Sequence, residues 1–161
     1  MQKTILLRLC FVATILLFGT QTVASQVCNS KLTVVKNRDS RSATVNDPTK
    51  FQLELQNNSS KSQNYTISSI VYDKACDQQS SSVRSGSTVD MNVSISQNNF
   101  RSNTITVAPG STALVIAEVS VGAKIKPNQW YCVELVAASD QCSSKTQSKK
   151  LKVYVTDGSE Y

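Results

Sequence analysis

Histidine is absent from this 161-residue sequence. Histidine is the usual general base of Ser-His and Cys-His nucleophile pairs, it titrates near neutral pH, and it is the commonest zinc ligand. Its absence excludes those enzyme classes and removes the main donor of a zinc site. We therefore expect a protein that is not an enzyme and that has no catalytic residues, no metal and no cofactor.

Glycine is scarce, and closely paired cysteines are missing. The five glycines do not form a phosphate-binding loop, and no two cysteines have the C-x-x-C spacing of metal and redox sites. Carboxylates are the remaining catalytic groups, and Glu54, Glu118 and Glu134 lie in or near the polar phase of extended segments. A small hydrolase that uses carboxylates alone stays open as an alternative, and it requires two of these side chains to converge in a cleft.

Long hydrophobic runs are missing except for one near the start of the chain. Lys3 and Arg8 come before or beside the apolar run 9–18, and small and polar residues follow it. This order is typical of a secretory signal peptide. The run is shorter than the roughly 20 apolar residues that cross a bilayer, which argues against a membrane anchor. The prediction is a signal peptide over residues 1–25, cleaved after Ala24 or Ser25.

Export sets the compartment and the charge of the remaining chain. Residues 26–161 form one expected domain, without a transmembrane segment, located outside the cell, on its surface or in the periplasm. Loss of Lys3 and Arg8 lowers the formal net charge from +6 to +4. This mild excess does not predict nucleic-acid binding. Lipid attachment at Cys28 is an alternative fate for that cysteine.

Short alternating segments run through the rest of the chain, separated by turns rich in Asn, Ser, Pro and Gly. No window keeps a helical repeat. Polar residues 37–49 and 73–88 are expected to form loops. The expected strands are 31–36, 51–56, 65–72 and 89–96, three within 104–138 separated by turns at 108–111 and 126–128, and 149–155. This pattern predicts a single all-β domain with a sandwich architecture.

Four motifs carry a resemblance to a known family: FQLELQNNSS from Phe51, NYTIS from Asn64, TVAPGSTA from Thr106 and WYCVELVAAS from Trp130. Together they resemble the immunoglobulin-like sandwich modules, similar to fibronectin type III, of bacterial and archaeal secreted and surface proteins. The resemblance covers about the region 45–156. It implies an antiparallel immunoglobulin-like β-sandwich and a linker or binding role, since such motifs specify fold better than activity.

Four cysteines remain after the signal peptide, namely Cys28, Cys76, Cys132 and Cys142, and an even number in an oxidising compartment predicts disulfides. The strand order implied by the resemblance places Cys28 and Cys142 at one end of the sandwich and Cys76 and Cys132 at the other. Because bridged α-carbons lie within roughly 7 Å, the resemblance implies Cys28–Cys142 and Cys76–Cys132. A local Cys132–Cys142 bridge, whose spacing suits a hairpin, stays open as the alternative.

Aromatic residues and lysines near the end of the chain form a candidate binding surface. An aromatic residue that opens a strand is either a binding hot spot or the closure of one end of the core. Lysines in a final strand either attract an acidic partner or an anionic glycan, or they protect an edge strand from aggregation. The candidate residues are Trp130, Tyr131, Tyr154, Lys149, Lys150 and Lys152.

Four asparagines begin Asn-x-Ser/Thr triplets, which are glycosylation acceptors in a eukaryotic secreted protein. They are Asn57, Asn58, Asn64 and Asn92.

The functional expectation combines export, a sandwich fold and missing catalytic chemistry. We expect a secreted, non-catalytic binding or structural module that serves as an accessory subunit, with a protein partner, in a cell-surface or periplasmic assembly. The alternative is a carbohydrate-binding or adhesive module, which predicts aromatic residues exposed together on one face and a glycan as ligand.

Overall fold

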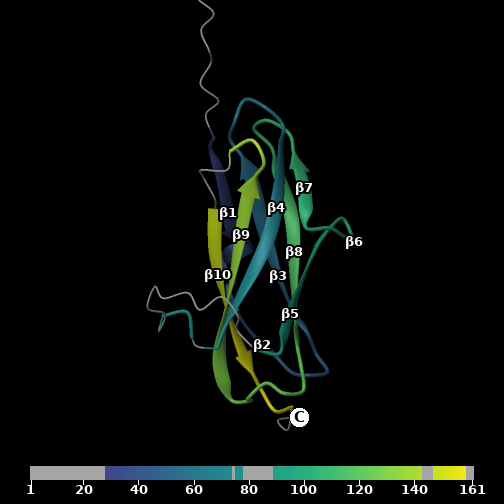
Figure 1. Ribbon diagram of the computed structural model, residues 1–161, viewed down its shortest axis with the longest axis vertical. Helices are drawn as coiled ribbons and strands as arrows, with labels where there is room; N and C mark the ends of the chain where they lie inside the picture. The colour runs from purple at the N-terminus through teal and green to yellow at the C-terminus, as the bar shows by residue number, and fades with distance from the viewer. Residues whose placement is uncertain (1–27, 74, 78–88, 143–146, 159–161) are drawn as a thin grey trace, which may run out of the picture.

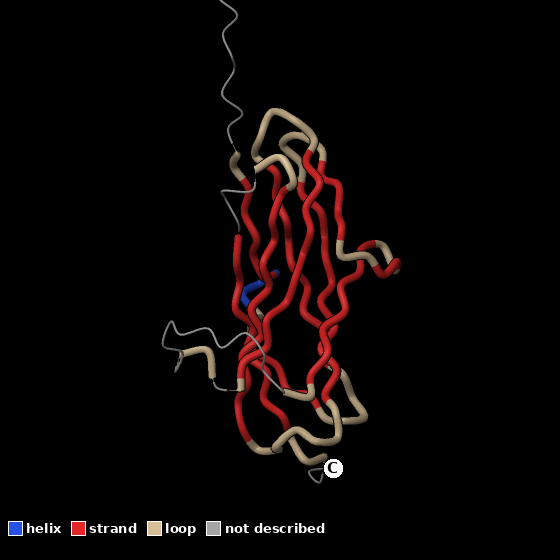
Figure 2. Tube along the Cα trace, in the orientation of Figure 1, coloured by secondary structure: helices blue, strands red, loops and turns tan. Residues whose placement is uncertain are grey.

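Two five-stranded sheets face each other and form an elongated β-sandwich in the computed structural model (Figures 1 and 2). The structure describes residues 28–73, 75–77, 89–142 and 147–158. The all-β, immunoglobulin-like sandwich predicted from the sequence is therefore confirmed. The predicted signal peptide and most of the polar segment 73–88 lie outside the described residues. Within the described residues, no helix is long and apolar enough to cross a membrane.

The first sheet has the strand order β1-β3-β8-β5-β6, and all of its pairs are antiparallel. Its strands are β1 (Ser30–Val34), β3 (Thr49–Asn57), β8 (Thr112–Val121), β5 (Met91–Gln97) and β6 (Phe100–Arg101).

The second sheet has the order β2-β10-β9-β4-β7 and is antiparallel except for the parallel pair β2–β10. Its strands are β2 (Ser40–Ala43), β10 (Gln147–Val155), β9 (Gln129–Ser139), β4 (Gln63–Tyr72) and β7 (Thr104–Val107). We call the end of the sandwich that is uppermost in Figure 1, near β7, the upper end. The opposite end along the strands, near β2, is the lower end.

The core lies between the sheets and follows from period-two alternation. In β3 the residues Phe51, Leu53 and Leu55 are fully buried, whereas Gln52 and Glu54 between them are exposed. Successive side chains of a strand point to opposite faces, so one face of each sheet is apolar. Burial of each large apolar side chain contributes about 1.5–3 kcal/mol. The sandwich is thus held together by the same alternation that predicts its strands.

The chain crosses between the two sheets repeatedly, and two of these crossings shape the strands beside them. The first crossing is a 3-10 turn (η1, Val35–Asn37) between β1 and β2, where Lys36 and Asn37 have φ angles of 55° and 53°. The second lies between β6 and β7. There Ser102 donates its N–H to Ile95 of the first sheet at 3.1 Å, and the carbonyl of the next residue, Asn103, accepts from Ile67 of the second.

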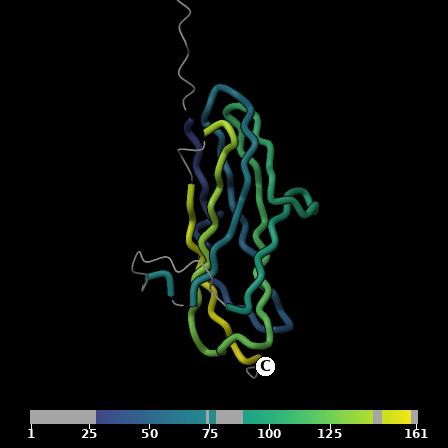
Figure 3. Tube along the Cα trace, viewed as in Figure 1, coloured from purple at the N-terminus to yellow at the C-terminus, as the bar shows by residue number. Residues whose placement is uncertain are grey.

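These crossings account for the differences between the expected and observed strands. The expected strand 31–36 ends at Val34 because the left-handed residues that follow turn the chain. The segment 37–49, expected to form a loop, contains β2, and the two-residue strand β6 was not expected. Near the upper end, β1 lies beside β10, seen as purple next to yellow in Figure 3.

Two disulfides tie the sandwich together, and they join the pairs that the resemblance implied. Cys28–Cys142 has a Cα–Cα distance of 5.7 Å and links the segment just before β1 to the loop after β9. Cys76–Cys132 has a Cα–Cα distance of 4.8 Å. Cys132 has the outward phase of β9 but is fully buried. The second bridge therefore holds the segment after β4 against the outer face of the second sheet.

Candidate functional site

Two aromatic rings lie together on the outer face of the second sheet, at its lower end. Trp130 in β9 is directly opposite Tyr154 in β10. Their ring centroids are 5.1 Å apart and the planes are tilted by 50°. This geometry lies within the range of favourable tilted aromatic pairs. Trp130 keeps 43% of its surface exposed. We call Trp130, Tyr154 and the neighbouring Lys150 and Lys152 the ring-pair surface.

Two exposed lysines share the outer face of β10 with Tyr154. Lys150 and Lys152 have the outward phase of β10 and are exposed. Neither forms an ion pair with another residue in the described part of the chain. Lys149 has the inward phase, and its Nζ lies 3.7 Å from the Asp39 carboxylate. The structure therefore places Lys152 next to Tyr154 on the outer face and Lys150 two residues further along β10, but directs Lys149 to the seam beside β2.

Tyr131 is not part of the ring-pair surface. It has the inward phase of β9 and is 3% exposed. Its hydroxyl donates a hydrogen bond to the Lys126 carbonyl at 2.9 Å and accepts one from the Gln129 side chain. Of the two readings of the Trp130–Tyr131 pair, the structure assigns core closure to Tyr131 and exposure to Trp130.

The three strand carboxylates do not converge. Glu54 and Glu118 lie on the outer face of the first sheet, where Glu118 is 3.3 Å from Lys50. Glu134 lies on the outer face of the second sheet, where it accepts a hydrogen bond from the Tyr72 hydroxyl at 2.8 Å. Partial burial and this bond raise the pKa of Tyr72, so it remains a neutral donor. These residues do not form the paired carboxylates of a hydrolase.

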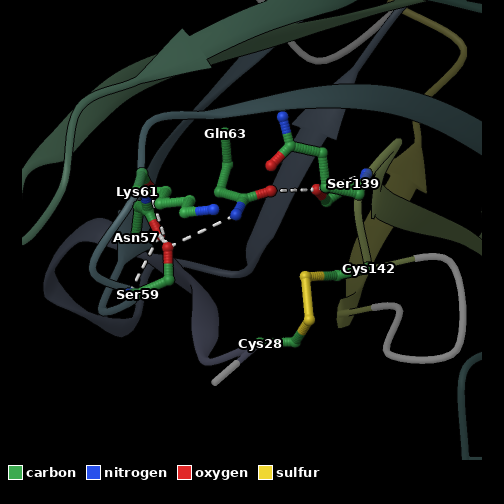
Figure 4. Close-up of a disulfide and its surroundings, with 8 residues drawn as sticks. Cys28, Asn57, Ser59, Lys61, Gln63, Ser139 and Cys142 are labelled. Atoms are coloured by element: carbon green, nitrogen blue, oxygen red, sulfur yellow. Dashed lines mark hydrogen bonds between the residues drawn. A yellow bond between two sulfur atoms is a disulfide. The ribbon is translucent and has the colours of Figure 1, made fainter. Parts of the chain in front are cut away.

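The upper end of the sandwich is closed by a cluster of buried polar side chains (Figure 4). Asn57 donates to the carbonyls of Lys61 at 2.8 Å and Val107 at 2.9 Å. Its Oδ1 accepts from the Ser59 hydroxyl at 2.6 Å. Gln63 accepts from the Ser139 hydroxyl, also at 2.6 Å. These bonds satisfy the cluster internally, so it stabilises the fold and offers no binding group.

Burial makes one of the four glycosylation triplets unsuitable. Asn57 is fully buried, and both hydrogens of its amide group are used in the polar cluster. A sugar at this nitrogen would displace those bonds and require space inside the sandwich. Asn58, Asn64 and Asn92 are exposed, so only these three keep accessible acceptor nitrogens.

Sequence reasoning missed the edge strand β2 and its residue Arg41. Ser40–Ala43 has only one buried residue, Ala43, so alternation is too weak to reveal a strand. Arg41 points inward, and its guanidinium carbon lies 6.0 Å from the centroid of the buried Phe51 ring. An arginine within a polar stretch gives no sequence signal for this position.

A family model for the Fn3-like domain matches residues 42–152. The chain belongs to the Fn3-like domain family. The match extends from β2 into β10 and thus includes all strands of the Fn3-like domain except β1. No curated protein sequence matches the chain.

Solved structures support the same fold. A family 123 glycoside hydrolase from Clostridium perfringens is similar with a TM-score of 0.52 and 12% identity, over 80% of this chain and 27% of that one. A FixG-related protein from Vibrio parahaemolyticus is similar with a TM-score of 0.51 and 11% identity, over 79% of this chain and 94% of that one. This chain spans about a quarter of the hydrolase. At such identities the likeness shows the fold alone, and an Fn3-like sandwich fits a non-catalytic binding or structural module.

Proposed function

We propose that this Fn3-like domain is a secreted, non-catalytic binding module that joins a protein partner, as an accessory subunit, in a cell-surface or periplasmic assembly. The observation that carries the proposal is the pair of the exposed Trp130 and the half-buried Tyr154 on the outer face of the second sheet. Two disulfides are consistent with an extracytoplasmic location, because such bonds persist in oxidising compartments.

The ring-pair surface has the composition of an interface centre. Tryptophan and tyrosine are enriched among residues that dominate binding energy, since they bury large areas with little loss of side-chain entropy. The stems of Lys150 and Lys152 extend the apolar surface while their charged ends stay in water. Deletion of a central aromatic anchor typically weakens binding by about 2 kcal/mol or more.

Chemical crosslinking in the native envelope, followed by mass spectrometry, tests the proposal. The wild-type chain is expected to crosslink to one recurrent protein, and the double variant Trp130→Ala/Tyr154→Ala is expected to lose that product. Phe100→Ala is the matched control, because Phe100 is 78% exposed but lies in β6 on the other sheet. Recovery of only the uncrosslinked monomer would overturn the proposal. Equal crosslinking by the double variant and by the Phe100→Ala control would overturn it as well.

A carbohydrate-binding module is the second candidate. The observation that favours it is that Trp130 and Tyr154 lie together on one face, as sugar-stacking residues do. The two candidates separate when the purified chain is titrated with neutral and anionic oligosaccharides. Glycan binding that disappears in Trp130→Ala/Tyr154→Ala, together with no crosslinked protein, would replace the protein partner with a glycan.

A further inference from the structure

The lower end of the second sheet has an edge with unused backbone groups. The carbonyls of Asp39 and Ala43 accept hydrogen bonds from Lys152 at 2.7 Å and from Thr156 at 3.0 Å. Backbone groups of successive residues in a strand point alternately to its two sides. The N–H and C=O groups of Ser40 and Ser42 therefore point away from β10. No other strand pairs with β2 in the described part of the chain.

The free side of β2 presents neither proline nor lysine to an approaching strand. Proteins protect edge strands with proline, lysine or bulges, and also with short strands and inward-pointing charges, so β2 carries only the last two of these devices, in its length and in Arg41. The outward residues of β2 are the small, uncharged and exposed Ser40 and Ser42. Ser42 is the register partner of Tyr154, which in turn is opposite Trp130. The open edge is thus continuous with the ring-pair surface.

A cation without a carboxylate partner lies at the same edge. Arg41 points between the two sheets, and its Nε is buried without a hydrogen bond. No carboxylate of the described residues forms an ion pair with it. A buried donor left unsatisfied is unfavourable, and the natural complement of the guanidinium is a carboxylate, which binds its planar array of N–H groups.

We infer that the free edge of β2 accepts an extended segment of the protein partner, which pairs antiparallel with Ser40 and Ser42 and places an acidic side chain opposite Arg41. This inference rests on the proposed function and specifies how the partner is held. Residues opposite each other at a non-hydrogen-bonded position of an antiparallel pair have Cα atoms about 4.5 Å apart, with their side chains close together. Arg41 occupies such a position, because its own backbone groups point to β10.

Selection from random displayed peptides of about ten residues, on the oxidised mature chain, tests the inference. The recovered peptides are expected to alternate β-branched or aromatic residues with polar ones and to share one Asp or Glu. A synthetic peptide of the consensus sequence should bind Ser42→Pro at least about fivefold more weakly than wild type, because one backbone donor is lost. Thr106→Pro is the matched control, since it makes the same change on the opposite edge strand, β7.

Two further measurements keep the test independent of folding defects. The peptide with its alternate backbone nitrogens methylated should fail to bind wild type, because methylation blocks edge pairing without altering the protein. Replacement of the shared acid by its amide should weaken binding to wild type but not to Arg41→Met, since the ion pair exists only in wild type. The amide of Ser42 should exchange more slowly when the peptide is bound.

Several results would overturn the inference. They are selected peptides without a shared acid, equal binding by Ser42→Pro and wild type, unchanged binding of the methylated peptide, or a free protein that already dimerises through β2. If one of these results is found but crosslinking in the envelope still depends on Trp130 and Tyr154, the binding function stands and only pairing at the β2 edge is ruled out. If neither a crosslinked protein nor a peptide is found, the proposed function fails as well.

Discussion

On the edge strand β7 the outward backbone groups of Thr104 are capped by a side chain, whereas those of Ser40 and Ser42 on the opposite edge strand, β2, are uncapped in the described structure. The hydroxyl of Ser102 donates to the Thr104 carbonyl at 2.8 Å and accepts from the Thr104 N–H at 3.2 Å. Those are groups that the edge strand β7 would otherwise offer to another strand. On β2, the corresponding groups of Ser40 and Ser42 have no such partner in the described structure. The contrast is therefore between the capped Thr104 and the backbone groups of Ser40 and Ser42, which remain available to another strand.

The buried polar cluster and the partly exposed aromatic pair lie at opposite ends of the sandwich. The upper end contains the buried polar cluster and the Cys28–Cys142 bridge, all satisfied within the chain. The lower end exposes Trp130 beside Tyr154. We therefore expect substitutions in the polar cluster and the Cys28–Cys142 bridge to lower the free energy of unfolding, and substitutions in the ring-pair surface to affect binding.

The largest effect on stability should come from the upper disulfide. The double variant Cys28→Ser/Cys142→Ser opens a loop with a sequence separation of 114, so the free energy of unfolding should fall by roughly 3–5 kcal/mol. Urea denaturation measures this change. Trp130→Ala/Tyr154→Ala serves as the comparison and should cost about 1 kcal/mol or less. Equal losses in the two double variants would remove the distinction between the ends.

Asn57→Ala should have the next largest effect. It leaves the carbonyls of Lys61 and Val107 and the Ser59 hydroxyl without their amide partner in the interior. We expect a loss of about 2–3 kcal/mol, measured by thermal or urea unfolding. Asn58→Ala is the matched control, because its neighbouring side chain is exposed. A stability loss no larger than that of the control would show that the cluster does not close the upper end.

Ser102→Ala should uncap Thr104 on the β7 edge at a smaller cost. The variant loses two hydrogen bonds to Thr104 at an exposed site, so the free energy of unfolding should fall by about 1 kcal/mol. The Thr104 amide should exchange faster, and self-association through β7 should rise with concentration. Sedimentation at several concentrations checks the second effect. A variant that behaves as wild type in both measurements would contradict the assigned role of Ser102.

The smallest expected effect concerns alkaline pH at the lower end. Burial and the Glu134 carboxylate raise the pKa of Tyr72 in the folded chain. The neutral hydroxyl therefore contributes stability below the usual tyrosine pKa of about 10, and this contribution is lost as pH rises through the raised folded pKa. Tyr72→Phe should be less stable than wild type at neutral pH, and the difference should shrink only as the pH rises above about 10. A difference independent of pH would exclude this linkage.

Much of the fold can be read from the sequence because alternation and turn residues agree. Residues 51–56 alternate cleanly and form the buried strand β3. The Pro109–Gly110 turn separates β7 from β8, and Gly110 adopts a φ of 64° there. The crossings between sheets are less visible, because Lys36 and Asn37 adopt left-handed angles that their residue types do not require.

The candidate site could be predicted only in part. Trp130 and Tyr131 are adjacent aromatics in a run that is apolar in both phases, so alternation alone does not decide which ring is buried. Register resolves this by pairing Trp130 with the outward Tyr154. β2 escapes prediction because a short parallel edge strand has few buried side chains, and the position of Arg41 depends on contacts far away in sequence.

Amide hydrogen exchange in the free, oxidised chain tests the contrast between the two edges most directly. The amides of Ser40 and Ser42 should exchange at nearly unprotected rates, whereas Thr104, bound by Ser102, and Lys152, bound by Asp39, should be slower by about tenfold or more. Ser42 exchanging as slowly as Lys152 would mean that the β2 edge is already occupied, and it would contradict the account.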